Sequence, residues 1–174
     1  MRKLLIIVLA AIAAVLAYAA TKPDTFQVSR SVSIKAPPEK IFPLINNLHS
    51  WTTWSPYEKL DPAMKRSYSG PESGVGAAYS WEGNSTVGAG KMEIAESTPS
   101  SAVKFKLDFF KPFNTHNTAE FTLAAEGDST TVTWTMDGPS PYISKVMGVF
   151  FNMDKMIGDA FTDGLNNLKG LSEQ

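Results

Sequence analysis

The sequence contains no cysteine and only two histidines, His49 and His116, in 174 residues. Without cysteine the chain has no disulfide, no thiol nucleophile and no thiolate ligand for a metal. Two histidines also disfavour a histidine-rich metal centre. We therefore expect neither a metal site nor a cofactor.

The chain also lacks an excess of charge of either sign. The formal net charge is −1, and the chain has no large block of either sign. Binding to nucleic acid needs concentrated lysine and arginine, so we expect no nucleic-acid partner. The motifs G-x-S-x-G and H-E-x-x-H are absent as well, and no paired carboxylates suggest a hydrolase.

The N-terminus has the composition of a targeting segment. Two basic residues, Arg2 and Lys3, precede an unbroken apolar run over residues 4–20, whose length is near the lower limit for a membrane-spanning helix. A secretory signal would be cut after Ala17-Tyr18-Ala19. An uncleaved anchor would instead keep the basic residues in the cytoplasm and place Tyr18 at the far membrane interface.

Both alternatives place the rest of the chain outside the cytoplasm, either anchored to the membrane or secreted. We expect residues 1–20 to take no part in the fold, residues 21–25 to form a short tether, and residues 26–174 to form one domain. The membrane contact would be made through residues 4–20.

Seven segments of the domain have the pattern of β-strands. Residues 26–34 alternate between apolar and polar side chains. A short helix is expected next, beginning at Pro37 or Pro38. The six later segments are residues 64–69, 75–82, 88–96, 102–110, 118–125 and 130–136. Clear alternation in the last three predicts an antiparallel sheet with one face in water.

The final segment, residues 141–171, has apolar side chains every three or four positions and predicts one long amphipathic helix. This helix alone is long enough to cover the dry face of the sheet. A curved sheet is wider than a helix, which is about 10 Å across. Bulky side chains fill the remaining space, or it stays open as a ligand cavity.

Several blocks of sequence carry a family resemblance: VSRSVSIKAPPEKIFPLINN at 28–47, WTTWSPYEKLDP at 51–62, YSGPESGVGAAYSWEGNSTVGAGKMEI at 68–94, VTWTMDG at 132–138 and MDKMIGDAFTDGLNNLKGL at 153–171. The chain resembles the START/Bet v 1-like (SRPBCC) superfamily, and within it a membrane-anchored bacterial subgroup of the polyketide cyclase/dehydratase and lipid transport group. This resemblance implies an α+β helix-grip fold, in which a curved seven-stranded antiparallel sheet surrounds a long C-terminal helix. It also implies a hydrophobic cavity between the two, but no particular reaction.

The candidate ligand-binding residues are mostly aromatic or flexible apolar side chains, which line pockets for apolar ligands. They are Trp51, Trp54, Tyr57, Tyr79, Trp81, Phe105, Phe109, Trp134, Met136, Met147 and Phe150. Any one of these rings also suits a hydrophobic core. We expect one of Trp51 and Trp54 to plug the open end of the sheet and the other to guard an entrance.

Two charged residues complete the candidate site. Arg30 has the inward parity of its strand, and Asp154 falls on the apolar stripe of the final helix. Either they anchor the polar head group of a ligand, or they lie near element ends and reach water. His49 and Asp154 are weak candidates for an acid or base.

These patterns favour the binding, transport or sensing of a hydrophobic small molecule or lipid. The alternatives are a cyclase or dehydratase that uses the same cavity, and a filled domain of the cell envelope that binds a protein partner.

Overall fold

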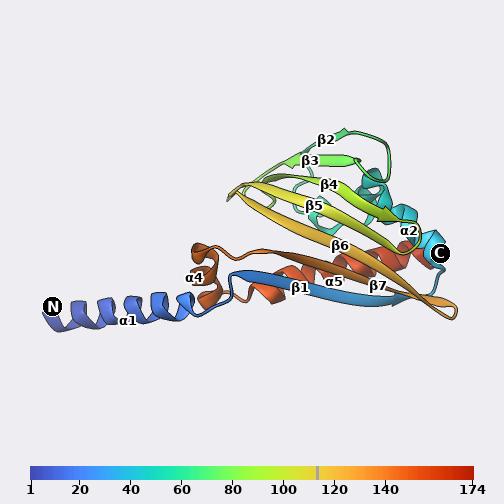
Figure 1. Cartoon of the computed structure of the whole chain (residues 1–174). Helices are drawn as coiled ribbons and strands as arrows, with labels where there is room; N and C mark the ends of the chain where they lie inside the picture. The colour runs from blue at the N-terminus through green and yellow to red at the C-terminus, as the bar shows by residue number, and fades with distance from the viewer. Residues whose placement is uncertain (113) are drawn as a thin grey trace.

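The protein is described here by a computed structural model, which covers residues 1–112 and 114–174. After the N-terminal helix, a strand and several short helices precede six consecutive strands and two final helices (Figure 1). The helices are α1 (Arg2–Ala20), α2 (Pro38–Asn46), α3 (Trp51–Trp54), α4 (Tyr142–Phe150) and α5 (Met153–Ser172), with 3-10 turns η1 (Leu48–Ser50) and η2 (Pro56–Lys59). The strands are β1 (Thr25–Ile34), β2 (Lys65–Ser69), β3 (Ala78–Glu82), β4 (Ala89–Thr98), β5 (Ala102–Lys111), β6 (Thr115–Glu126) and β7 (Ser129–Pro139).

The strands form one antiparallel sheet of seven strands in the order β1-β7-β6-β5-β4-β3-β2. β1 and β2 are therefore its two opposite edges. Apolar residues that alternate along the later strands are buried, as Phe105, Phe121 and Val132 show. The predicted α+β helix-grip fold and its alternating strands are confirmed.

Helix α5 covers the dry face of the sheet because one of its faces is apolar. Phe161, Leu165 and Leu168 on that face are all buried. Gly164 allows a close approach, since a Cβ atom there would lie 2.9 Å from the Trp134 ring and 3.0 Å from Pro56. Because carbon atoms normally stay farther apart, a larger residue at position 164 would require Trp134, Pro56 or the helix itself to shift.

The prediction of a single helix over residues 141–171 is wrong. α4 ends at Phe150, Phe151 has an extended backbone, and α5 starts afresh at Met153. The Asn152 side chain caps α5 by accepting a hydrogen bond of 2.9 Å from the Lys155 amide. The spacing of three to four residues continues through this break, but the apolar residues of α4 are exposed, whereas those of α5 are buried against the sheet.

Helix α1 is long and apolar enough to cross a membrane by length and composition, and it points away from the sheet (Figure 1). Its last turn does not stand free of the domain, contrary to expectation. The Tyr142 hydroxyl of α4 donates a hydrogen bond of 2.8 Å to the Leu16 carbonyl, and Ala19 is fully buried. The end of α1 is thus packed against α4.

Candidate functional site

Both tryptophans of the WTTW segment lie in the core. Trp51 and Trp54 are buried, and their indole N–H groups donate hydrogen bonds of 3.0 Å to the carbonyls of Ile45 and Leu44. These bonds fix α3 against α2 and satisfy both buried donors. The expectation that one tryptophan guards an entrance is wrong.

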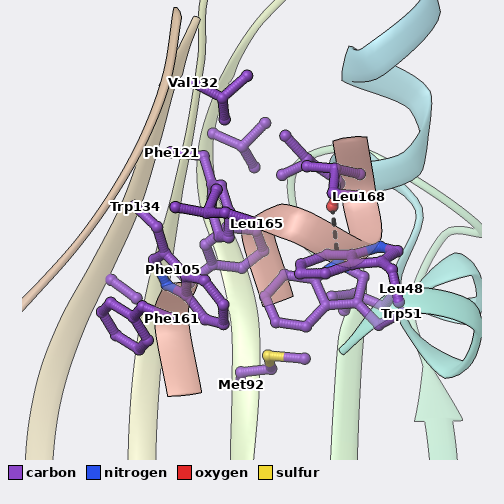
Figure 2. Close-up of a cluster of buried hydrophobic side chains, with 14 of the residues drawn as sticks. Leu48, Trp51, Met92, Phe105, Phe121, Val132, Trp134, Phe161, Leu165 and Leu168 are labelled. Atoms are coloured by element: carbon purple, nitrogen blue, oxygen red, sulfur yellow. Dashed lines mark hydrogen bonds between the residues drawn. The ribbon is translucent and has the colours of Figure 1, made fainter. Parts of the chain in front are cut away.

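The rings between the sheet and α5 are in contact with one another (Figure 2). Trp134 of β7 stacks on Phe161 of α5, with ring centroids 4.0 Å apart and planes inclined by 6°. Its neighbour Phe121 stacks on it at 4.7 Å, and Trp51 meets the edge of Phe105 at 5.4 Å. Aromatic side chains therefore fill the central space in which the sequence allowed a cavity.

The Trp134 indole nitrogen is buried and has no hydrogen-bond partner among the described residues. A buried donor without a partner costs about 1–3 kcal/mol. The ring position is nevertheless fixed by close packing, because Gly164 and Phe161 of α5 both lie against it. Stacking thus holds this donor in place without satisfying it.

The other predicted apolar residues divide into two groups. Tyr79 and Met136 are buried, and Trp81 and Phe109 are half-buried, with their ring centroids 5.8 Å apart. Met147 and Phe150 lie on α4 and are exposed. The interpretation that these two line the space between sheet and helix is therefore wrong.

A hollow of about 410 Å³ lies outside this core, between η2 and α5. Its lining residues are Pro56, Tyr57, Lys59, Leu60, Ala160, Asp163, Asn166 and Asn167. We call it the η2–α5 groove. Of the predicted site residues it includes only Tyr57, whose ring meets the edge of Trp134 at 6.4 Å.

Tyr57 combines accessibility with dense surroundings. The residue is 37% exposed, yet the protein around it raises the pKa of Tyr57 to about 12 through burial. A position in a hollow accounts for both properties, because atoms crowd the ring from several sides while one side stays open. The hydroxyl is therefore protonated at neutral pH and is available to donate a hydrogen bond.

Glu58 fixes the η2 wall of the groove to the sheet. Its side chain is only 8% exposed and accepts hydrogen bonds of 2.6 Å from Arg66 Nε and 2.7 Å from the Tyr79 hydroxyl. Hydrogen bonding to this carboxylate raises the pKa of Arg66, while burial, followed by the same carboxylate, raises the pKa of Tyr79. Glu58 could not be recognised from the sequence, because its partners come from β2 and β3.

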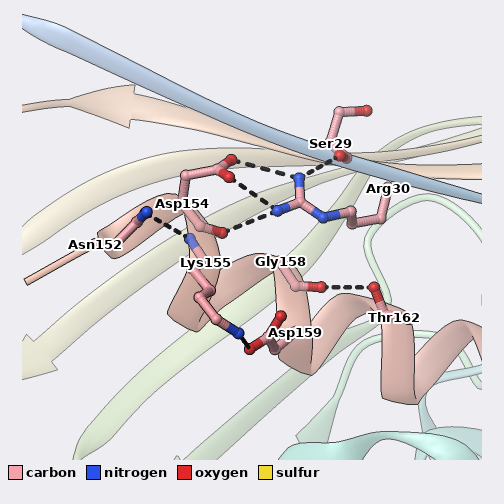
Figure 3. A network of polar contacts seen from close by, with 8 residues as sticks. All are labelled: Ser29, Arg30, Asn152, Asp154, Lys155, Gly158, Asp159 and Thr162. Atoms are coloured by element: carbon pink, nitrogen blue, oxygen red, sulfur yellow. Dashed lines mark hydrogen bonds and ion pairs between the residues drawn. The ribbon is translucent and has the colours of Figure 1, made fainter.

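Arg30 and Asp154 pair with each other at the N-terminal end of α5 (Figure 3). Arg30 Nη2 lies 2.9 Å from Asp154 Oδ2 and also donates to the Asp154 carbonyl at 3.1 Å. The hydrogen bond from Arg30 holds the pKa of Asp154 below its ordinary value. Because the two charges satisfy each other near the surface, they fasten α5 to β1.

His49 lies at the other edge of the sheet. Its ring stacks on Tyr68 of β2, with centroids 3.8 Å apart, beside a second hollow of about 280 Å³. Asp154 binds β1, the opposite edge strand. The two acid–base candidates are therefore not brought together into one catalytic site.

No metal centre is evident in the part of the chain that the structure describes, where no group of three or more His, Asp or Glu side chains is arranged to hold an ion.

The curved sheet closed by a C-terminal helix defines a helix-grip protein. A family model described as polyketide cyclase / dehydrase and lipid transport matches residues 25–173, and the chain belongs to this family. The family is associated with hydrophobic ligands and with polyketide cyclase-like activity. A search of curated proteins gave no match.

Solved structures share the fold at low sequence identity. Protein CV1439 from Chromobacterium violaceum is 14% identical with a TM-score of 0.61, and the match covers 88% of this chain and 99% of that one. The Aha1 dimer from Colwellia psychrerythraea is 18% identical with a TM-score of 0.60, covering 85% and 96%. DynU16, a protein in the dynemicin biosynthetic locus, is 17% identical with a TM-score of 0.59, covering 88% and 48%.

Proposed function

We propose that the protein is a membrane-tethered domain that binds a hydrophobic small molecule or a lipid chain in the η2–α5 groove. The observation that carries this proposal is the groove itself, a hollow of about 410 Å³ beside the aromatic core. Its volume lies within the range of small-molecule sites, about 300–1,000 Å³. The family description supports an apolar ligand, and α1 supplies a candidate tether.

The groove has the apolar walls that such a ligand needs. Leu60 is 48% exposed there, and Tyr57, Pro56 and Ala160 form the rest of the apolar lining. Covering these side chains would stabilise a complex by about 25 cal/mol for each Å² of apolar surface removed from water. A ligand in this groove needs no chemical step to be bound.

Polar groups at the rim would orient the ligand. Lys59 and Asp163 provide opposite charges, and Asn166 an amide, while the Tyr57 hydroxyl is a donor. Asn167 is already engaged, since its side-chain nitrogen donates a hydrogen bond of 3.0 Å to the Trp54 carbonyl. A few polar groups within an apolar lining are typical of sites that fix the orientation of a ligand.

The test is photo-cross-linking of the full chain in lipid nanodiscs with a diazirine-bearing fatty acid. We expect labelled peptides from residues 56–60 and 160–167. Ala160→Trp should abolish this labelling by filling the groove, whereas Val75→Trp, at an exposed position outside it, should not. Labelling that Ala160→Trp leaves unchanged would contradict the proposal.

A second candidate follows from the filled interior. Stacking of Trp134 between Phe121 and Phe161 favours a closed domain that presents its surface to a protein partner in the envelope. This alternative would be favoured if the groove were not labelled and if native mass spectrometry showed the protein without a bound ligand. A cyclase or dehydratase that uses His49 as its acid or base would lose turnover in His49→Ala. His49 and Asp154 lie at opposite edges of the sheet, so their positions give that function no support.

A further inference from the structure

Helix α4 carries an exposed apolar face at the end of the candidate membrane helix. Tyr142, Ile143, Met147 and Phe150 are each between 44% and 66% exposed, and Phe151 continues the face beyond the helix end. Turns of 3.6 residues place these side chains on one half of the helix surface. We call this set the α4 face.

The opposite side of α4 is tied to the domain. Lys145 is the only charged residue of the helix; its side chain is 8% exposed and pairs with Asp24 just before β1. This pairing lowers the pKa of Asp24. Because Lys145 is held on the inner side, the outward half of α4 carries no charge.

The position of α4 decides what covers its apolar face. The Tyr142 hydroxyl binds the Leu16 carbonyl, so α4 lies beside the last turns of α1 (Figure 1). Tyr18 and Lys22, which are linked by a hydrogen bond of 2.8 Å, lie at this same C-terminal end of α1. Tyrosine and lysine are typical of the membrane–water interface. Where α1 would leave the bilayer, α4 would meet its surface.

We propose that the α4 face lies on the lipid bilayer that α1 enters, with its side chains at the boundary between head groups and acyl chains. Helices with an apolar half and a polar half bind membranes in this way, buried by about 5–10 Å. This inference rests on the tether part of the proposed function, but not on ligand binding. The break at Phe151 and Asn152 then directs α5 from the membrane to the sheet.

The absence of cysteine makes a direct test possible, because single cysteines can be introduced without a background. The full chain is reconstituted in vesicles of equal parts phosphatidylcholine and phosphatidylglycerol. An environment-sensitive NBD probe is attached at Met147→Cys or Phe150→Cys. The matched control is Asp128→Cys in the exposed β6–β7 turn. This turn lies at the end of β7 opposite to the end that leads into α4.

We expect nitroxide lipids labelled near the carbonyl end of the acyl chain to quench the probes at positions 147 and 150, but not at position 128. With Met147 and Phe150 both changed to Glu, a probe at Ile143→Cys should lose this quenching. Circular dichroism of each variant checks that the fold is kept.

Three outcomes would overturn the proposal. Probes at 147 and 150 that aqueous iodide quenches as readily as the control would show a face in water. Probes shielded from both iodide and nitroxide lipids would show a face covered by a second copy or another protein. Extraction of the chain from vesicles by alkaline carbonate would show that α1 does not anchor the protein in the bilayer. Fatty-acid labelling of the groove is measured separately, so a failure of the proposed ligand binding is distinguishable.

Discussion

The guanidinium group of Arg30 lies directly against Gly158 of α5. A Cβ atom at position 158 would clash with three atoms of that group, and Arg30 reaches past the glycine to Asp154. Gly158 thus leaves the space through which β1 is fastened to α5 (Figure 3). A helix-interior glycine costs about 1 kcal/mol relative to alanine. At position 158 this cost is offset, because the absence of a Cβ leaves room for the Arg30 guanidinium.

The effect of Gly158→Ala on the free energy of unfolding should therefore depend on the residue at position 30. With Arg30 replaced by Ala, the substitution should stabilise the protein by about 1 kcal/mol, the ordinary helix propensity difference. With Arg30 present, this gain should be offset, because the displaced arginine loses its pair with Asp154. A double-mutant cycle by urea denaturation measures the coupling. Equal effects in the two backgrounds would contradict the arrangement.

Asp154→Asn should weaken thermal stability at neutral pH but not in acid. The pKa of Asp154 is lowered in the folded protein, so its stabilisation is present above the unfolded value of about 3.9 and is lost as the pH falls through the folded value. The melting temperatures of wild type and Asp154→Asn should converge over that acidic range. Asp137→Asn is the control, since Asp137 is exposed and has no ion pair among the described residues. A difference that persists in acid would show another cause.

The sheet was predictable from sequence, because alternation is a local pattern. The segments predicted at 102–110 and 130–136 became β5 and β7 with only small changes at their ends. The break between α4 and α5 was not predictable in the same way. The apolar period continues across Phe151, and a period does not reveal whether its face meets a sheet or the exterior.

The site was less predictable, because one residue type serves several environments. Trp51, Trp54 and Trp134 suit a core and a cavity wall equally well, and only their mutual packing shows that they fill the interior. Glu58 gave no signal in sequence. Its burial depends on Arg66 and Tyr79, which lie 8 and 21 residues farther along the chain.

Trp54→Ala should destabilise the domain strongly, by about 3–5 kcal/mol, as truncation of a fully buried aromatic ring does. Trp54 is fully buried and packs against Phe121 and Trp134, and it donates to the Leu44 carbonyl. Tyr57→Ala, at a partly exposed ring, should cost clearly less. Denaturation of the full chain in mild detergent, followed by far-ultraviolet circular dichroism, compares the two. Equal losses would contradict the difference in packing between the fully buried Trp54 ring and the partly exposed Tyr57 ring.

Glu58→Gln should loosen the η2 wall of the groove and lower the free energy of unfolding by about 1–3 kcal/mol. The substitution removes the charge that binds Arg66 at 2.6 Å, in a side chain that is almost fully buried. Glu72→Gln, at an exposed position, is the matched control and should stay within about 0.5 kcal/mol of wild type.

The same substitution also links stability to the proposed site. Glu58 is the neighbour of Tyr57, so release of η2 should reduce fatty-acid labelling of the groove even under conditions where the protein remains folded. Denaturation and labelling are measured on the same preparation. A variant as stable as Glu72→Gln would refute the structural role of the Glu58–Arg66 pair. A destabilised variant with undiminished labelling would show that the ligand does not depend on the η2 wall.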